Sequence, residues 1–533
     1  MNSAQREQPI PTGPTLPPNS FGEVTSRSPR LHQSGITILG SAAFLGAGHL
    51  FFSGNSDHAI IFTLLCVVAL GCIWSWASRS IKGLPFLPLF LLQQGMIYAM
   101  PLVVGDENLS IISSGTLYLS AFSVVLLLLS ALAGHRMGSR SAGPPPLTRW
   151  PFFRDRNITS SPRTANLCLA LLGSSIAFYL TTRSGLLYQL LPGSLWSLFP
   201  VIRTGSDAAS MFGALIGGIA LVDHPQRIKA VIYWVLLASI FFLSIADVLL
   251  SAATGLIIAT SIGMALGRAK FPWFFLISAF AILAFLNQGK FTVRDKYWDS
   301  ETNTTRLAIS QLPTFYLDWA SVSAEQLLWK EDDLFEPTTA KPSKEEEGQN
   351  LLDRIDNLQI LTFVVNSIES EGKPTLLGKT YALIPPLLVP RFLWHDKPRS
   401  HEGQVLLNLH FERQKTREET EKTYIAWGLL PEAVGNFGVF FGPIFLGLLG
   451  GFVCGKLEYF SIRKELFSIE GLILLALLLK VTTSFEMVSS VFVTSTFQFL
   501  VVVAIGSWFV CLWFRSGAPP VSLRRTAPQI SRP

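Results

Sequence analysis

The residues best suited to chemistry lie in one block late in the chain, YALIPPLLVPRFLWHDKPRSHEG, residues 381–403. Arginine can hold a phosphate through two parallel hydrogen bonds, and lysine supplies a compact positive charge. An imidazole or carboxylate beside such cations can take the proton of an attacking hydroxyl group. The block therefore predicts a site that holds a diphosphate and activates a hydroxyl. Its ionisable residues are Arg391, His395, Asp396, Lys397, Arg399, His401 and Glu402.

A plainer interpretation of this block stays open. Arg391, Lys397 and Arg399 also suit the anchoring of a polypeptide at a membrane surface, and the two histidines also suit exposed loop positions. The three prolines of LIPPLLVP prevent a continuous helical span, although the segment is apolar enough to enter a membrane.

The second candidate stretch is AWGLLPEAVGNFGVFFG, residues 426–442. Glu432 and Asn436 are four residues apart, so a helix places them on one face. An ionisable residue at the mouth of a membrane span is costly unless it is paired or hydrated. Glu432 is therefore a candidate general base, alongside His395, and Asn436 is a candidate substrate-binding residue. A purely structural role for Glu432 is the alternative.

Two further arginines are candidate substrate ligands. Arg203, in VIRTGSDAAS, lies just before an apolar run, where it could hold a phosphate or simply extend its charge to the membrane surface. Arg354 belongs to LLDRIDNLQILTFVVNSIES, whose apolar residues recur at helical spacing. That spacing predicts an amphipathic helix.

Long apolar runs must position these residues. The chain has 533 residues, of which 49% are hydrophobic and 15% charged, whereas soluble domains carry roughly a quarter charged residues. An apolar run of about 18–20 residues crosses the hydrocarbon core as a helix. The sequence predicts an all-α, polytopic helical membrane protein with about twelve transmembrane helices. The expected spans are 35–53, 58–77, 84–104, 115–134, 165–182, 207–222, 229–246, 248–267, 271–288, 437–455, 469–485 and 490–513.

The charge of the loops predicts how these spans are oriented. Alternate loops carry the arginines and lysines, for example at Arg136–Arg163 and Lys456–Lys464, while Gly54–Asp57 and Gly105–Asn108 contain neither. Since positive loops stay in the cytoplasm, both termini are expected there. The large polar loop between spans nine and ten then faces outward, as does Arg203.

These boundaries divide the chain into five parts. The large outward loop, 289–436, is expected to contain amphipathic and re-entrant segments. Its charged middle stretch, KEDDLFEPTTAKPSKEEEGQN, is expected to be a solvated insert without a site. The remaining parts are a disordered tail at 1–34, membrane segments at 35–288 and 437–513, and a second tail at 514–533.

Several classes of function are disfavoured. The five cysteines all lie in apolar runs, and no Cys/His cluster has zinc-like spacing, so neither a disulfide framework nor a metal site is expected. No phosphate-binding glycine loop or dinucleotide fingerprint is present. The net charge of +6 comes mostly from span ends, so nucleic acid is not an expected partner. No cofactor is expected.

The two stretches together resemble a known family. IPPLLVPRFLWHDKP, followed some thirty residues later by GLLPEAVGNFGVFFG, is similar to oligosaccharide repeat-unit polymerases of the O-antigen polymerase type. The likeness in motif covers about residues 381–442, and elsewhere it is one of architecture. The sequence has His395 where such proteins more often have proline, and its mid-loop insert is long.

The resemblance implies metal-independent glycosyl transfer at the periplasmic face of a bacterial inner membrane. A polyprenyl-diphosphate-linked glycan would be the donor and a lipid-linked repeat unit the acceptor. Arg391 and Arg203 would hold the diphosphate, Lys397 would assist, and Glu432 or His395 would act as base. The remaining expected substrate-binding residues are Asp396, Glu402, Asn436 and Arg354.

Other functions stay open on the sequence alone. A related O-antigen ligase would use the same donor, and a flippase or transporter would also have many spans. A non-catalytic assembly protein would tolerate loss of Arg391 and Glu432. Besides the bilayer, a chain-length regulator and a flippase of the same pathway are the expected protein partners.

Overall fold

The chain folds almost entirely into helices. The computed structural model describes residues 21, 29–79, 81–104, 109, 112–140, 163–190, 198–221, 227–248, 250–268, 272–299, 304–305, 307–332, 357–391, 393–394, 396–422, 426–482, 484 and 487–515. The helices before the large loop are α2 (Pro29–Phe52), α3 (Ser56–Ala77), α4 (Phe86–Val104), α6 (Ser114–Arg140), α7 (Thr164–Arg183), α8 (Leu186–Leu190), α9 (Phe199–Ala220), α10 (Arg227–Ile245), α11 (Leu250–Arg268) and α12 (Trp273–Gln288).

The large loop is also structured over much of its length. It begins with α13 (Lys290–Tyr297), which bends 59° away from α12. A two-residue antiparallel ladder of β1 (Trp298–Asp299) and β2 (Thr304–Thr305) follows. The remaining loop elements are η3 (Ile309–Gln311), α14 (Leu312–Asp332), α15 (Leu358–Glu369), η5 (Tyr381–Leu383), α16 (Ile384–Leu388), α17 (Glu402–His410) and α18 (Arg417–Lys422).

Three helices complete the chain: α19 (Leu429–Ser461), α20 (Ile469–Thr482) and α21 (Ser489–Arg515). The amphipathic helix expected around 351–370 is present as α15. The tail expected to be disordered at 1–34 overlaps the start of α2 at Pro29.

Every predicted span coincides with a helix. Within the described residues, eight helices are long and apolar enough to cross a membrane, and the bent pair of α12 and α13 would make a ninth. The eight are α2, α3, α4, α6, α7, α10, α19 and α21. The protein is therefore a polytopic helical membrane protein. The count of about twelve stays a prediction, because α20 has 14 residues and covers only about 21 Å as a helix.

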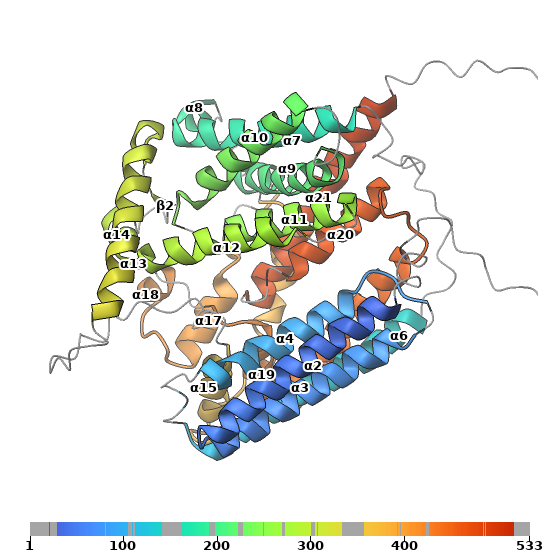
Figure 1. Cartoon of the computed structure of the whole chain (residues 1–533). Helices are drawn as coiled ribbons and strands as arrows, with labels where there is room; N and C mark the ends of the chain where they lie inside the picture. The colour runs from blue at the N-terminus through green and yellow to red at the C-terminus, as the bar shows by residue number, and fades with distance from the viewer. Residues whose placement is uncertain are drawn as a thin grey trace, which may run out of the picture.

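The helices form two groups (Figure 1). In one, α2, α3, α4 and α6 run side by side with α19; in the other, α7, α9, α10, α11 and α12 pack together. Between them, α20 contacts α4, α9 and α11, while α21 contacts α9 and the loop helices α16 and α17. The last two helices therefore join the two groups to the large loop.

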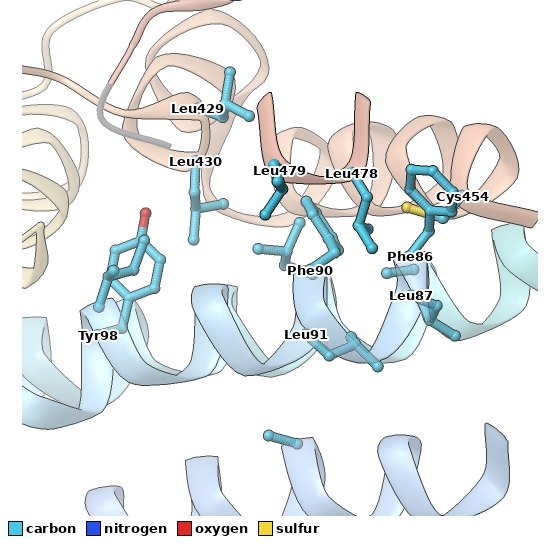
Figure 2. Packing of buried hydrophobic residues seen from close by; sticks show 14 of the residues in the cluster. Phe86, Leu87, Phe90, Leu91, Tyr98, Leu429, Leu430, Cys454, Leu478 and Leu479 are labelled. Atoms are coloured by element: carbon cyan, nitrogen blue, oxygen red, sulfur yellow. The ribbon is translucent and has the colours of Figure 1, made fainter. Parts of the chain in front are cut away.

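Side chains of α4 fill the space between the N-terminal helices and the last part of the chain. Figure 2 shows Phe90 pointing toward Leu478 and Leu479 of α20, and Tyr98 pointing toward Leu430 of α19. All five side chains are buried. This contact fixes the depth of α19 relative to α4, and so positions the polar residues that follow Leu430.

Close backbone contact holds α6 against α19. Gly447, Gly451 and Gly455 are spaced by four along α19, and a Cβ atom at Gly451 would overlap the carbonyl oxygen of Ala131. At Gly455 the carbonyl oxygen of His135 would lie 2.5 Å away. Small residues at this spacing let two membrane helices approach closely and gain dispersion contacts. This contact was not among the features expected from the sequence.

Replacing Gly451 by alanine should lower the free energy of unfolding by about 1–3 kcal/mol, since the added methyl group must push α6 away. Thermal unfolding of the purified protein in one detergent measures the change. The control is Gly71→Ala in α3, where an added Cβ meets no atom within 4 Å; alanine there should be neutral or slightly stabilising. Equal destabilisation by both variants would contradict the close-packing argument.

Candidate functional site

The two candidate stretches meet beside the first turns of α19. The backbone N–H of Leu376 donates to the carbonyl oxygen of Gly435 at 3.0 Å, and that of Leu377 to Asn436 at 2.9 Å. The ring of Tyr381 stacks on that of Phe437, with centroids 5.6 Å apart. Residues more than fifty positions apart therefore form one assembly, which neither stretch could build by itself.

A break at Gly438 shapes this assembly. Gly438 has φ 80° and ψ 174°, so α19 consists of a short helix before it and a long one after it. Positive φ strains residues with a side chain, and glycine relieves that strain. The short piece carries Glu432 and Asn436. These two residues therefore lie on a separate helical turn beside the membrane helix, not on its continuous first turn.

Glu432 is fully buried at the centre of the assembly. One carboxylate oxygen accepts a hydrogen bond from the Thr380 hydroxyl at 2.7 Å. The other accepts one from the backbone N–H of Ser489 at 2.5 Å. Ser489 is the first residue of α21, where unpaired N–H groups and the helix dipole attract a negative charge. Glu432 therefore ties the start of α21 to Thr380, and each of its oxygens already accepts one hydrogen bond.

Asn436 shares this face, as the four-residue spacing predicts. Its side-chain nitrogen donates to the Thr380 hydroxyl and to the Glu432 carbonyl oxygen, both at 2.8 Å. Among the described residues, its buried side-chain oxygen has no hydrogen-bond donor. A buried acceptor of this kind is costly unless water or a ligand supplies a hydrogen bond. Asn436 is thus suited to receive a hydroxyl group.

Arg391 and Lys397 differ in what they do. The Lys397 ammonium donates to the carbonyl oxygens of Leu387 at 2.8 Å and Val389 at 2.5 Å, and so closes the end of α16. Burial, followed by the positive charge of Arg391, lowers the pKa of Lys397. Arg391 itself is exposed. The structure thus leaves Arg391 facing solvent, while Lys397 holds the loop that presents it.

The other loop candidates are less central. Glu402 accepts two hydrogen bonds from the Arg417 guanidinium, at 2.9 and 2.7 Å, in a pair that is partly exposed to solvent. Asp396 is exposed. Two candidates, His395 and Arg354, lie outside the described residues.

Arg203 belongs to another part of the molecule. It lies in the first turns of α9, where it and Lys480 of α20 both interact electrostatically with Asp207. Arg391 follows α16 and interacts electrostatically with Lys397. The two arginines expected to share one diphosphate thus lie on different elements, one on α9 and the other after α16.

From the sequence, His401 could be either part of the site or an exposed histidine of the loop. It directly precedes α17, and its Nδ1 lies 3.2 Å from the side-chain oxygen of Gln404. Burial lowers the pKa of His401, and the hydrogen bond with Gln404 raises it by a smaller amount. The neighbouring Ser400 carbonyl accepts a hydrogen bond at 2.9 Å from Ser490 in the first turn of α21.

The described residues offer no set of ligands for a metal ion. Within the described parts of the chain, no group of three or more His, Cys, Asp or Glu side chains is arranged to hold an ion.

Comparison with known proteins adds no identification. No family model matches the sequence, and neither the curated proteins nor the solved structures compared with it give a significant match.

Proposed function

We propose that this protein is a polymerase of surface polysaccharide in a bacterial inner membrane. It would transfer a polyprenyl-diphosphate-linked glycan to a lipid-linked repeat unit at the periplasmic face, with both termini in the cytoplasm. The observation that carries the proposal most is that residues 376–381 pack against residues 432–437 around a buried polar centre. Arg391 is exposed in the loop that follows α16. The positive charge of alternate loops supports the orientation.

The chemistry follows from the exposed cation of Arg391 and the polar groups around Asn436. The hydroxyl oxygen of the acceptor sugar attacks the anomeric carbon of the donor, and the bond from that carbon to the diphosphate oxygen breaks. The new bond is glycosidic, and the polyprenyl diphosphate leaves with the bonding electrons. Arg391 stabilises the negative charge that develops on the leaving group, through two parallel hydrogen bonds. The hydroxyl proton passes to a base.

His401 is the described residue that best suits the role of base. Since its pKa is lowered, the imidazole is neutral and able to accept a proton near pH 7. Glu432 instead acts as a positioning residue, because both of its oxygens are already hydrogen bonded. His395 remains the second candidate base.

The His401 assignment predicts acid sensitivity. Activity should fall as the pH drops through the folded-state pKa, which lies below about 6.5, because the protonated ring cannot accept a proton. Stability should fall in the same direction, since the unfolded chain takes up this proton at a higher pH than the folded chain. Polymer formation by the purified protein across this range measures the first effect, and His401→Gln should remove most activity.

The matched control for this prediction is His410→Gln. His410 lies in the same loop, and its ring nitrogen is 2.7 Å from the carbonyl oxygen of Pro374. This variant should keep the activity and the pH profile of the parent. An unchanged profile in His401→Gln would contradict the assignment.

The proposed function is tested by deleting the gene and analysing the glycans that remain on the lipid carrier. A polymerase predicts single repeat units on the carrier, which the purified protein then joins into longer chains. A ligase predicts finished polymer that accumulates on the carrier. A flippase or transporter predicts single units confined to the cytoplasmic face, and an assembly scaffold predicts that Arg391→Ala remains active.

A further inference from the structure

Two stripes of exposed apolar side chains run along α3 and α6, which lie side by side (Figure 1). Val67 and Trp74 are seven residues apart on α3, and both are exposed. Phe122 and Leu129 have the same spacing on α6 and are also exposed. A spacing of seven returns to the same face of a helix. Each of these membrane helices therefore presents one apolar stripe to lipid.

Polar contacts at both ends hold α3 and α6 in register. At one end, the Tyr118 hydroxyl of α6 donates to the Asp57 carboxylate of α3 at 3.1 Å. At the other end, the Arg136 guanidinium of α6 donates to the Ser75 hydroxyl of α3 at 3.1 Å. Positions 57 and 75, like positions 118 and 136, are eighteen residues apart, which is about 27 Å at 1.5 Å per residue. The stripes therefore match the thickness of a hydrocarbon core, and Arg136 lies at its edge.

Three arginines gather at this end of the stripes. Arg136 and Arg140 are exposed and four residues apart, so they lie on one face of α6. Arg79 follows the end of α3 and interacts electrostatically with both of them. Like charges held together repel one another, and an anion placed among them relieves that repulsion.

The carboxylate of Glu458 also interacts electrostatically with this arginine group, but it is buried. It accepts a hydrogen bond from the Trp76 indole N–H at 2.7 Å and lies 2.5 Å from Nε2 of His135. Both of those side chains are buried as well. Among the described residues, no carboxylate forms an ion pair with Arg136 or Arg140. These two exposed guanidinium groups can therefore bind a ligand that approaches from outside the helices.

The neighbours of the arginines suit a lipid. Trp74 precedes Ser75 in the chain and is 63% exposed, and Met137 follows Arg136 and is 59% exposed. Tryptophan favours the depth of the lipid headgroups. At that depth a guanidinium group can donate paired hydrogen bonds to a phosphate. A zwitterionic headgroup also carries a cation, so clustered arginines favour a lipid of net negative charge.

We propose that this surface of α3 and α6 binds an anionic phospholipid. The phosphate contacts Arg136 and Arg140, Arg79 adds to the positive potential, and the acyl chains lie along the two apolar stripes. The inference goes beyond the proposed polymerase function and does not depend on it. A bound lipid of this kind stabilises the folded protein by mass action.

Binding of defined lipids to the purified full-length protein tests this inference. Phosphatidylglycerol or phosphatidylcholine is added in detergent, and native mass spectrometry measures the fraction of protein that retains each lipid. Arg136→Gln combined with Arg140→Gln should weaken phosphatidylglycerol binding at least tenfold and leave phosphatidylcholine binding unchanged. Arg140→Gln alone breaks no hydrogen bond or ion pair with a described residue and should weaken phosphatidylglycerol binding several-fold. Lysine at both positions should keep part of the binding, since the charge remains without the paired donors.

The matched control combines Arg227→Gln with Lys229→Gln at the start of α10, in the other helix group. It also removes two positive charges and should keep phosphatidylglycerol binding within twofold of the parent. Equal loss in the two double variants would overturn the inference, since the lipid would then respond to overall charge rather than to a site. Equal binding of both lipids to the parent protein would overturn it too. Polymer formation is not measured, so failure of this inference leaves the proposed function unaffected.

Discussion

Replacing Glu432 by alanine is expected to lower the free energy of unfolding by about 2–5 kcal/mol and to abolish polymer formation. The change leaves two buried donors, the Thr380 hydroxyl and the Ser489 N–H, without an acceptor. Each buried and unpaired group costs roughly 1–3 kcal/mol. The start of α21 also loses the acceptor that satisfies its first backbone N–H group. Thermal unfolding in detergent measures the first effect, and glycan chain length in cells measures the second.

The matched control is Glu402→Ala. Glu402 forms a partly exposed ion pair with Arg417, and such pairs contribute at most about 1 kcal/mol. This variant should therefore stay close to the parent in stability.

The Glu432→Gln variant distinguishes a positioning role of Glu432 from a role in proton transfer. Its amide keeps the shape of the side chain but places an N–H group opposite one of the two donors. A positioning role predicts that stability and activity fall together. A glutamine variant with parental stability and no activity would instead make Glu432 a proton-transfer group, contrary to the role derived from its buried contacts.

Replacing Arg391 by alanine is expected to reduce polymer formation on the order of 100–1000-fold, with little change in folding. The side chain is exposed, so its removal creates no cavity and no unpaired partner within the described residues. A charge-assisted contact with the leaving diphosphate contributes several kcal/mol to the transition state. Arg391→Lys should recover only part of the activity, because lysine lacks the paired donors. Chain elongation by the purified protein measures the effect.

Arg417→Ala controls for the loss of a positive charge in the same loop. It removes the exposed partner of Glu402 and should keep activity within a few-fold of the parent. Parental activity in Arg391→Ala, in protein that is folded and inserted, would remove the main support for phosphate binding at this position.

Two groups of charged side chains lie on different elements of the fold. Arg203 and Lys480 lie on membrane helices, whereas Arg391 lies in the loop after α16. The helix α21 contacts both regions, and its first residue is the one that Glu432 binds. Loss of the Glu432 contact is therefore expected to disturb both clusters, which explains why this single residue carries the largest predicted effect.

The class of the protein follows from the amino-acid sequence alone, because hydropathy is a local property of the chain. Apolar runs such as 115–134 must lie in lipid whatever their neighbours are, and helices are what satisfy their backbone there. The four-residue spacing of Glu432 and Asn436 placed them on one face for the same local reason. The amphipathic periodicity of 351–370 likewise predicted α15.

The roles of the site residues depend on long-range contacts, which are seen only in the folded structure. The acceptor role of Glu432 depends on Ser489, which lies 57 residues away, and on Thr380, which lies 52 residues away. No local pattern encodes such distant pairs. In the same way, only the folded loop shows that Lys397 closes α16 while Arg391 remains exposed. The types of the side chains determine which reactions are possible. Long-range packing determines which of these side chains are exposed and able to react.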